Sequence, residues 1–221
     1  MKLFLDTADV GEVRQAVALG IISGVTTNPK LAAEAEPGSF RDRITEILAC
    51  SSGPVSVEVV SESVDEMLVE AREYASWDTR VAVKIPMSLE GLEVISKLER
   101  EHDTRVNVTC MMNSNQALLA MMAGATYVSL FAGRINDMGY DADVVIRETA
   151  EFIERGNFEA EIIAGSMRQI VDIQRAFLAG AHIVTAPYKF VPQMCHHPRT
   201  IETIDEFKTA WDGARNRGGL S

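Results

Sequence analysis

The amino-acid sequence predicts an α/β protein folded as a single (β/α)8 TIM barrel over residues 1–221, with an extra helix at the C-terminus. Eight short apolar runs alternate with longer segments of helical period along the whole chain. Such alternation is typical of a parallel sheet covered by helices. The length of 221 residues suits one barrel as a single domain. No linker or shift in composition interrupts the series, so we expect the sheet to close on itself.

The expected strands are short and rich in apolar residues. They are Lys2–Leu5, Gly24–Thr26, Val55–Val59, Val81–Ile85, Arg105–Thr109, Tyr127–Phe131, Glu161–Ala164 and His182–Thr185. Between them, apolar residues recur at helical spacing, as Met67, Leu68 and Ala71 do. The stretches 123–128 and 179–184 resemble each other, and each has a glycine where a helix would end before a strand.

Composition excludes several classes of protein. The net charge of −11 argues against a nucleic-acid partner, because phosphate backbones require a basic surface. No apolar run approaches the roughly 20 residues that span a bilayer, and an aspartate interrupts the N-terminal run too early for a signal peptide. The cysteines, Cys50, Cys110 and Cys195, lack the spacing of a metal site. We expect a cytoplasmic protein with reduced thiols, no metal and no membrane contact.

Polar side chains end or follow most of the expected strands. In a barrel of this kind, the carboxyl ends of the strands meet at one mouth, where the chemistry takes place. The polar residues near these ends are Asp6, Thr26, Asn28, Glu58, Lys84, Asn107, Thr109, Arg134, Ser166 and Arg168. We therefore predict a polar site at this mouth.

Lys84 is the most unusual of these residues, because it lies within the apolar strand 81–85. Lysine is almost never fully buried without a reason. Desolvation lowers the pKa of an amine and leaves it able to attack a carbonyl group. The alternative is a structural lysine paired with a buried acid such as Glu58 or Asp6. The strand pattern alone does not separate the two interpretations, and the other polar strand ends favour the catalytic one.

Arg134, Ser166 and Arg168 form a second candidate cluster. Two guanidinium groups, together with N–H groups at the start of the helix after residue 168, suit a phosphate or a similar oxyanion. The alternative is that both arginines pair with surface carboxylates, of which the 32 acidic residues offer many. His196 and His197 have no acidic or cysteine partner at ligand spacing, so they indicate a surface helix end and no metal site.

Taken together, these motifs resemble the short transaldolase and fructose-6-phosphate aldolase family over residues 2–213. The resemblance rests on seven segments in the same order: Phe4-Leu5-Asp6-Thr7-Ala8, Gly24-Val25-Thr26-Thr27-Asn28-Pro29, Val55-Ser56-Val57-Glu58-Val59, Val83-Lys84-Ile85-Pro86, Asn107-Val108-Thr109, Phe131-Ala132-Gly133-Arg134 and Gly165-Ser166-Met167-Arg168. The resemblance implies an enzyme of sugar phosphate metabolism that acts through a lysine Schiff base and needs no cofactor.

The resemblance also assigns roles to individual residues. Lys84 would form the Schiff base, and Asp6 would be the base for the proton of the C4 hydroxyl. Glu58 and Thr109 would hold the water that relays protons. The dihydroxyacetone portion would be oriented by Thr26, Asn28 and Asn107, and the phosphate would be clamped by Arg134, Ser166 and Arg168. The resemblance further implies a homo-oligomer, because short members form rings of five and decamers in which the C-terminal helix embraces a neighbour.

Two positions favour a transaldolase over an aldolase. In the family, aldolases carry a tyrosine where this chain has Phe131 and a glutamine where it has Glu58. A phenol can orient or activate water, whereas a phenyl ring cannot. The expected reaction is therefore transfer of a dihydroxyacetone unit from sedoheptulose 7-phosphate or fructose 6-phosphate to an aldose phosphate. Simple aldol cleavage and non-catalytic binding of sugar phosphates remain the alternatives.

Three features depart from the family pattern. Lys30 stands where serine or threonine is usual, and it either adds a cation to the mouth, for example for a sulfonated ketose, or is a solvated helix residue. The stretch Cys110-Met111-Met112-Asn113 replaces a more usual aliphatic-aromatic-serine stretch, and Lys189 follows the last strand at an unexpected position. These changes could reshape the side of the site that takes the acceptor.

Overall fold

The computed structural model shows a closed barrel of parallel strands, which confirms the predicted fold class. The structure describes residues 1–34, 39–101 and 104–216. The strands follow one another around the barrel in chain order, and β1 pairs with β8 to close it. The strands are β1 (Lys2–Asp6), β2 (Ile22–Thr26), β3 (Val55–Glu58), β4 (Val81–Pro86), β5 (Val106–Met111), β6 (Tyr127–Phe131), β7 (Glu161–Gly165) and β8 (Ile183–Ala186).

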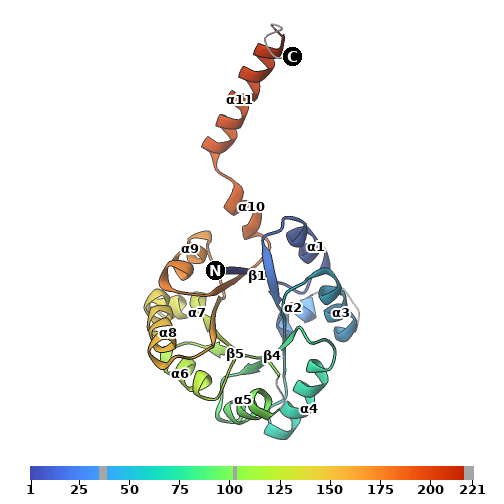
Figure 1. Cartoon of the computed structure of the whole chain (residues 1–221), viewed down its shortest axis with the longest axis vertical. Coiled ribbons are helices and arrows are strands. Elements are labelled where there is room, and N and C mark those ends of the chain that lie inside the picture. The colour runs from blue at the N-terminus through green and yellow to red at the C-terminus, as the bar shows by residue number, and fades with distance from the viewer. Residues whose placement is uncertain (35–38, 102–103, 217–221) are drawn as a thin grey trace. The chain divides into compact units, whose positions relative to one another are not determined.

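Helices surround the barrel as an outer ring, as Figure 1 shows. Within residues 1–188 they are α1 (Val10–Ala18), α2 (Pro29–Glu34), α3 (Phe40–Cys50), α4 (Val64–Ala75), α5 (Leu89–Glu101), α6 (Ser114–Met122), α7 (Ala132–Asp137), α8 (Ala142–Gly156) and α9 (Ile170–Ala179). A second compact unit, residues 189–221, contains α10 (Phe190–Cys195) and α11 (Pro198–Asn216), the predicted C-terminal helix. The single domain over residues 1–221 stays a prediction.

The predicted strands agree with the observed ones to within two residues at each end. The repeat between stretches 123–128 and 179–184 is also structural. Gly124 and Gly180 both adopt the left-handed backbone conformation, with φ of 105° and 112°; Gly124 comes two positions after the end of α6, and Gly180 directly follows α9. Residues with a Cβ rarely adopt this conformation, so glycine ends both helices and lets the chain turn into the next strand.

The interior of the barrel is filled by apolar side chains at one level and polar side chains at the next. Phe4, Ala82, Tyr127, Ile163 and Ile183 form a buried cluster in the centre. Because side chains two residues apart on a strand point to the same face, the next inward positions lie one level closer to the carboxyl ends. Those positions are Asp6, Lys84, Ser129, Gly165 and Thr185. The apolar cluster is therefore the floor beneath a polar layer.

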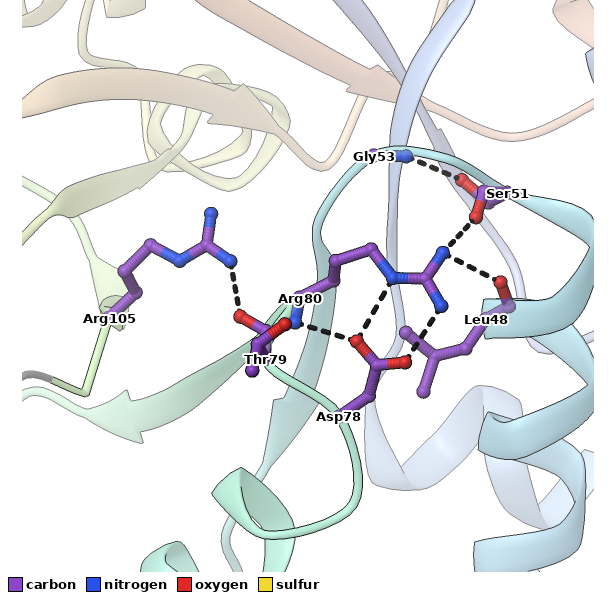
Figure 2. A network of polar contacts seen from close by, with 7 residues as sticks. All are labelled: Leu48, Ser51, Gly53, Asp78, Thr79, Arg80 and Arg105. Atoms are coloured by element: carbon purple, nitrogen blue, oxygen red, sulfur yellow. Dashed lines mark hydrogen bonds and ion pairs between the residues drawn. The ribbon is translucent and has the colours of Figure 1, made fainter.

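At the opposite end of the barrel, a polar network ties three loops together (Figure 2). Arg80, directly before β4, pairs with Asp78 at 2.7 Å and donates to the backbone oxygen of Leu48 at 2.9 Å near the end of α3. Arg105, directly before β5, donates to the backbone oxygen of Thr79 at 2.6 Å. These contacts hold the amino ends of the strands and leave the carboxyl ends for the site.

Candidate functional site

A pocket of about 430 Å3 opens at the carboxyl ends of the strands. Most of the residues predicted for the site line this pocket: Asp6, Thr26, Asn28, Glu58, Lys84, Phe131, Arg134, Ser166 and Arg168. The two others, Asn107 and Thr109, are fully buried in β5. Seven strands or the loops directly after them thus bring the predicted residues to one place.

Lys84 lies inside the pocket and is only 5% exposed. Its Nζ atom is 2.8 Å from Oε2 of Glu58 and donates to the backbone oxygen of Thr27 at 3.1 Å. The strand register explains this pairing, because Glu58 and Lys84 stand opposite each other on β3 and β4. The lysine therefore has both features that the sequence left as alternatives. It pairs with a buried acid, and that pair faces the pocket.

Asp6 ends β1 and lines the pocket above the apolar floor. Its Oδ1 atom accepts a hydrogen bond from the hydroxyl of Thr26 at 2.9 Å. Burial raises the pKa of Asp6 above its ordinary value, and the charge of Lys84 and the Thr26 bond only partly oppose this effect. A carboxylate that is ionised but poorly solvated is a stronger base than one in water, which suits proton abstraction.

Thr109 contributes a hydroxyl without a protein partner. Its Oγ1 atom is buried and makes no hydrogen bond within the described residues. A buried hydroxyl group without a partner costs free energy, so such groups normally bond to a ligand or to water. The role of Thr109 in holding a reactive water stays a prediction.

The side-chain amide of Asn107 lies between two serine hydroxyls. The hydroxyl of Ser129 donates to Oδ1 of Asn107 at 2.6 Å, and Nδ2 of Asn107 donates to Ser56 at 3.0 Å. These bonds fix the amide plane of Asn107, which is fully buried and does not line the pocket, so its predicted contact with the dihydroxyacetone portion stays a prediction. Asn28, in contrast, uses Oδ1 to accept from the N–H of Leu31 at 3.0 Å, so it caps α2 and has only its NH2 group for the pocket.

The sequence prediction missed three hydroxyl residues of the site, Ser56, Ser129 and Thr185. Ser129 and Thr185 line the pocket, and Ser56 lies beneath it. For Ser129 and Thr185 the signal was present in the alternation of the strands, because each follows an inward apolar residue by two positions. Small hydroxyl residues are common in strands, so this signal is weak in the sequence alone.

The cluster expected to bind an anion is assembled after β6 and β7. Arg134, on α7, lies with its guanidinium carbon 4.9 Å from the ring centre of Phe131, and it has no carboxylate partner in the part of the chain that the structure describes. Arg168 pairs with Asp137 at 3.1 Å in an exposed bridge. Such an exposed pair contributes little to the free energy of folding. A phosphate could therefore take the place of Asp137 as the partner of Arg168.

The helix after β7 does not offer its N–H groups as expected. The N–H groups of Arg168 and Gln169 both donate to Oδ2 of Asp172, at 2.9 Å and 2.8 Å. The reason is that α9 begins at Ile170 and Asp172 caps its first turn. The predicted anion would therefore have to be held by the guanidinium groups and by Ser166, without these two N–H groups. Ser166 adopts a left-handed conformation with φ of 62°, which is uncommon outside glycine and occurs often at functional sites.

Gly133 allows α7 to approach the Ser166 segment closely. A Cβ atom at Gly133 would lie 1.9 Å from the backbone oxygen of Ser166 and 3.0 Å from Cγ of Arg168. Gly133→Ala is therefore expected to push this segment aside and to raise the KM for a phosphorylated ketose about tenfold or more, since a misplaced clamp loses part of its binding free energy. The check is to compare KM for the same ketose with and without phosphate. An equal rise for both would contradict the assignment of this segment to the phosphate.

The departures from the family pattern also have places in the structure. Lys30 is exposed and lines the mouth of the pocket, so it lies beside the site although solvent reaches it. Cys110 lines the pocket with φ of 63°, at an irregularity in the pairing of β5 with β6. Burial raises the pKa of its thiol, which keeps it in the weakly nucleophilic protonated form. Lys189 lies in the second unit, with its Nζ atom 5.1 Å from the ring centre of Phe190.

Neither a metal cluster nor a membrane segment is found within residues 1–34, 39–101 and 104–216. No group of three or more histidine, cysteine, aspartate or glutamate side chains gathers there. His197 instead accepts from the N–H of Arg199 at 3.2 Å, close to the start of α11. No helix in this part is long and apolar enough to cross a membrane.

Comparison with known proteins gives consistent results. Residues 3–218 match the protein family described as Transaldolase/Fructose-6-phosphate aldolase. The chain is 46% identical to a probable transaldolase of Oceanobacillus iheyensis over 97% of its own length and 100% of that protein. It is 44% identical to a probable transaldolase of Herpetosiphon aurantiacus, covering 96% of this chain and 95% of the other. A probable transaldolase of Streptococcus agalactiae is 44% identical over 98% of this chain and 100% of its own.

Proposed function

Because this chain belongs to the transaldolase/fructose-6-phosphate aldolase family, we propose that it is a transaldolase that moves a dihydroxyacetone unit between sugar phosphates through a Schiff base on Lys84. The observation that carries this proposal is the ion pair between the buried Lys84 and the half-buried Glu58, which faces a pocket that also contains Asp6. A lysine amine, a proton acceptor beside it and a separate base are the groups that such a reaction requires.

The first half-reaction begins with the proton on Lys84. Glu58 is within hydrogen-bond distance and can take this proton, leaving the free amine to attack the C2 carbonyl of a ketose phosphate. The carboxylic acid of Glu58, with a water held by Thr109, then protonates the leaving hydroxyl of the carbinolamine. Loss of water gives an iminium ion between C2 and the nitrogen of Lys84.

The iminium nitrogen then accepts the electrons of the C3–C4 bond. Asp6 removes the proton from the C4 hydroxyl, the C3–C4 bond breaks, and the C4 oxygen becomes the carbonyl of the departing aldehyde. The three-carbon remainder stays on Lys84 as an enamine. Attack of its C3 atom on an aldose phosphate reverses these steps, with Asp6 returning the proton, and hydrolysis releases the new ketose.

The remaining pocket residues support the recognition of a sugar phosphate. Ser129 and Asn28 present a hydroxyl and an amide group at the pocket for the hydroxyls of the three-carbon unit, and the buried Asn107 holds the Ser129 hydroxyl in place. Arg134 and Arg168, beyond Ser166, supply two guanidinium forks for the phosphate. On a chain with a net charge of −11, such a local cationic cluster is needed to attract an anionic substrate.

Transferase and aldolase activities differ in the fate of the enamine, and the structure favours transfer. Phe131 lines the pocket where a tyrosine could orient water onto the enamine. The test is an assay with fructose 6-phosphate, run with and without erythrose 4-phosphate. We expect release of glyceraldehyde 3-phosphate only when the acceptor is present. Equal release without it would identify an aldolase, and binding without release in either case would identify a non-catalytic protein.

We further propose that the protein acts in the cytoplasm, in the pentose phosphate pathway, as a homo-oligomer. The support is the resemblance to oligomeric relatives, together with α11. In that helix Ile201, Ile204, Phe207 and Trp211 recur at intervals of three and four residues, so they share one face. Analytical ultracentrifugation of the intact chain tests the homo-oligomer, and a monomer at micromolar concentration would contradict that part of the proposal.

A further inference from the structure

Three side chains from neighbouring strands form a chain of hydrogen bonds that ends on Asp6. The hydroxyl of Thr26, on β2, lies 2.9 Å from Oδ1 of Asp6 and 2.6 Å from the hydroxyl oxygen of Thr185 on β8. Thr26 is 3% exposed and Thr185 is 6% exposed, so water does not compete strongly for either hydroxyl. The order along the chain of bonds is therefore Thr185, Thr26, Asp6.

The number of available protons sets the direction of these bonds. An ionised carboxylate only accepts hydrogen bonds, and a threonine hydroxyl has a single proton. When Asp6 is ionised, the Thr26 hydroxyl uses its single proton to donate a hydrogen bond to Asp6. Thr185 must then be the donor in the hydrogen bond between the two threonines. Donation to a hydroxyl oxygen makes that hydroxyl a better donor in turn, because hydrogen bonds in a chain polarise one another.

We infer that Thr185 is a positioning residue for the reaction, which holds the Thr26 hydroxyl on the Asp6 carboxylate and so keeps Asp6 ionised and aimed into the pocket. This inference rests on the proposed function, in which Asp6 is the base. Thr185 need not contact the reacting atoms for this role, since it acts through Thr26.

The packing of Thr185 supports this role. A Cβ atom at Gly165, on the neighbouring strand β7, would lie 3.2 Å from the methyl group of Thr185. The methyl group therefore points towards β7, where glycine leaves room for it. With the methyl group held there, the hydroxyl is turned the other way, across β1 to Thr26. Thr185 also follows the floor residue Ile183 by two positions, so it points inward, and it lines the same pocket as Asp6.

The charges around Asp6 show why such a chain is useful. Burial disfavours the ionised form, and the nearby Glu58 disfavours it further, whereas Lys84 and the Thr26 bond favour it. The strands on both sides of β1 supply the hydroxyls: Thr26 on β2 stands opposite Asp6 in the register, and Thr185 on β8 stands opposite Phe4 and reaches Thr26 with its hydroxyl. The other cations of the pocket are Lys30, Arg134 and Arg168. Once Lys84 carries the substrate, the hydroxyl chain continues to favour the ionised carboxylate.

The test compares Thr185→Val, which removes the hydroxyl at nearly constant shape, with Thr185→Ser, which keeps it. In Thr185→Val we expect the acid limb of the pH profile of kcat to move to higher pH by about half a pH unit. The reason is that the hydrogen bond from Thr26 to Asp6 weakens when Thr185 no longer donates to Thr26, and the pKa of Asp6 then rises. Thr185→Ser is expected to restore the limb to its wild-type position. Borohydride trapping of the Lys84 adduct is expected to persist in both. A limb that Thr185→Val does not move would overturn the inference.

A double-mutant cycle with Thr26→Val separates the proposed role from a general effect on the pocket. Thr26→Val removes the direct bond to Asp6, so its limb is expected to move by about one pH unit. Because Thr185 acts through Thr26, adding Thr185→Val is expected to cause no further shift. Additive shifts would contradict the inference. Asp6→Asn, measured alongside, tests the proposed function separately from the role of Thr185. Full cleavage activity in that variant would refute the assignment of Asp6 as the base.

Discussion

Replacing Lys84 with methionine is expected to abolish both turnover and covalent trapping of the substrate. Methionine has a similar length and fills the buried position, but it has no amine to form the iminium ion. Loss of a covalent nucleophile removes the reaction path itself, so we expect kcat to fall by at least about 10,000-fold. Borohydride added with fructose 6-phosphate is expected to attach the sugar or a three-carbon unit to the peptide that contains Lys84, and to no peptide of the variant.

Lys84→Arg is the matched control for the ion pair. Arginine keeps a cation beside Glu58, so the buried carboxylate retains its partner, but a guanidinium group is not a nucleophile at neutral pH. We expect this variant to be as inactive as Lys84→Met but more stable to heat. Lys97→Met, on the surface of α5, controls for nonspecific labelling and is expected to behave like the wild type. Trapping or turnover that survives in Lys84→Met would refute the Schiff base on this residue.

The fold was predictable because its signals are local and repeated. Eight apolar runs separated by helical segments leave few architectures, and glycines at 124 and 180 mark two of the junctions. The burial of Lys84 was predictable for a related reason, since the strand that contains it is apolar on both sides. The direct pairing with Glu58 depends on the register between β3 and β4, which the sequence does not encode locally.

The parts of the site that escaped prediction depend on contacts between distant segments. Thr26 and Thr185 are 159 residues apart, and nothing in either strand indicates that their hydroxyls meet. The capping of α9 by Asp172 similarly removes two N–H groups that the sequence had assigned to an anion. The left-handed conformation of Ser166 is imposed by its surroundings, because serine has no local preference for it. Such features follow from the assembled barrel and cannot be read from the pattern of residues.

Replacing Asp6 with asparagine is expected to have opposite effects on activity and on stability. Without the base, the proton of the C4 hydroxyl has no acceptor, so cleavage is expected to fall by about 100- to 10,000-fold while the Lys84 adduct still forms. Burial raises the pKa of Asp6 in the folded protein, so the folded state holds this proton more tightly than the unfolded chain does. Ionisation above that pKa therefore costs stability, and the uncharged amide avoids this cost. We expect a rise in Tm of roughly 2–4 °C at neutral pH, as about 1 kcal/mol produces in a protein of this size.

Asp78→Asn is the control with the opposite sign. Hydrogen bonds from Arg80 lower the pKa of Asp78 to about 2 (Figure 2), so its ionised form stabilises the fold at pH values above the ordinary aspartate range, and that stability is lost as the pH falls towards 2. Its Tm at neutral pH is therefore expected to fall. The rise in Tm of Asp6→Asn, in contrast, is expected to vanish at pH values below the ordinary aspartate pKa, where Asp6 is protonated in the folded and unfolded states alike. Thermal scans from pH 3 to pH 8 measure both curves. An Asp6→Asn protein that loses stability at neutral pH would show that the carboxylate is needed for the fold, and that its strained environment does not serve the reaction.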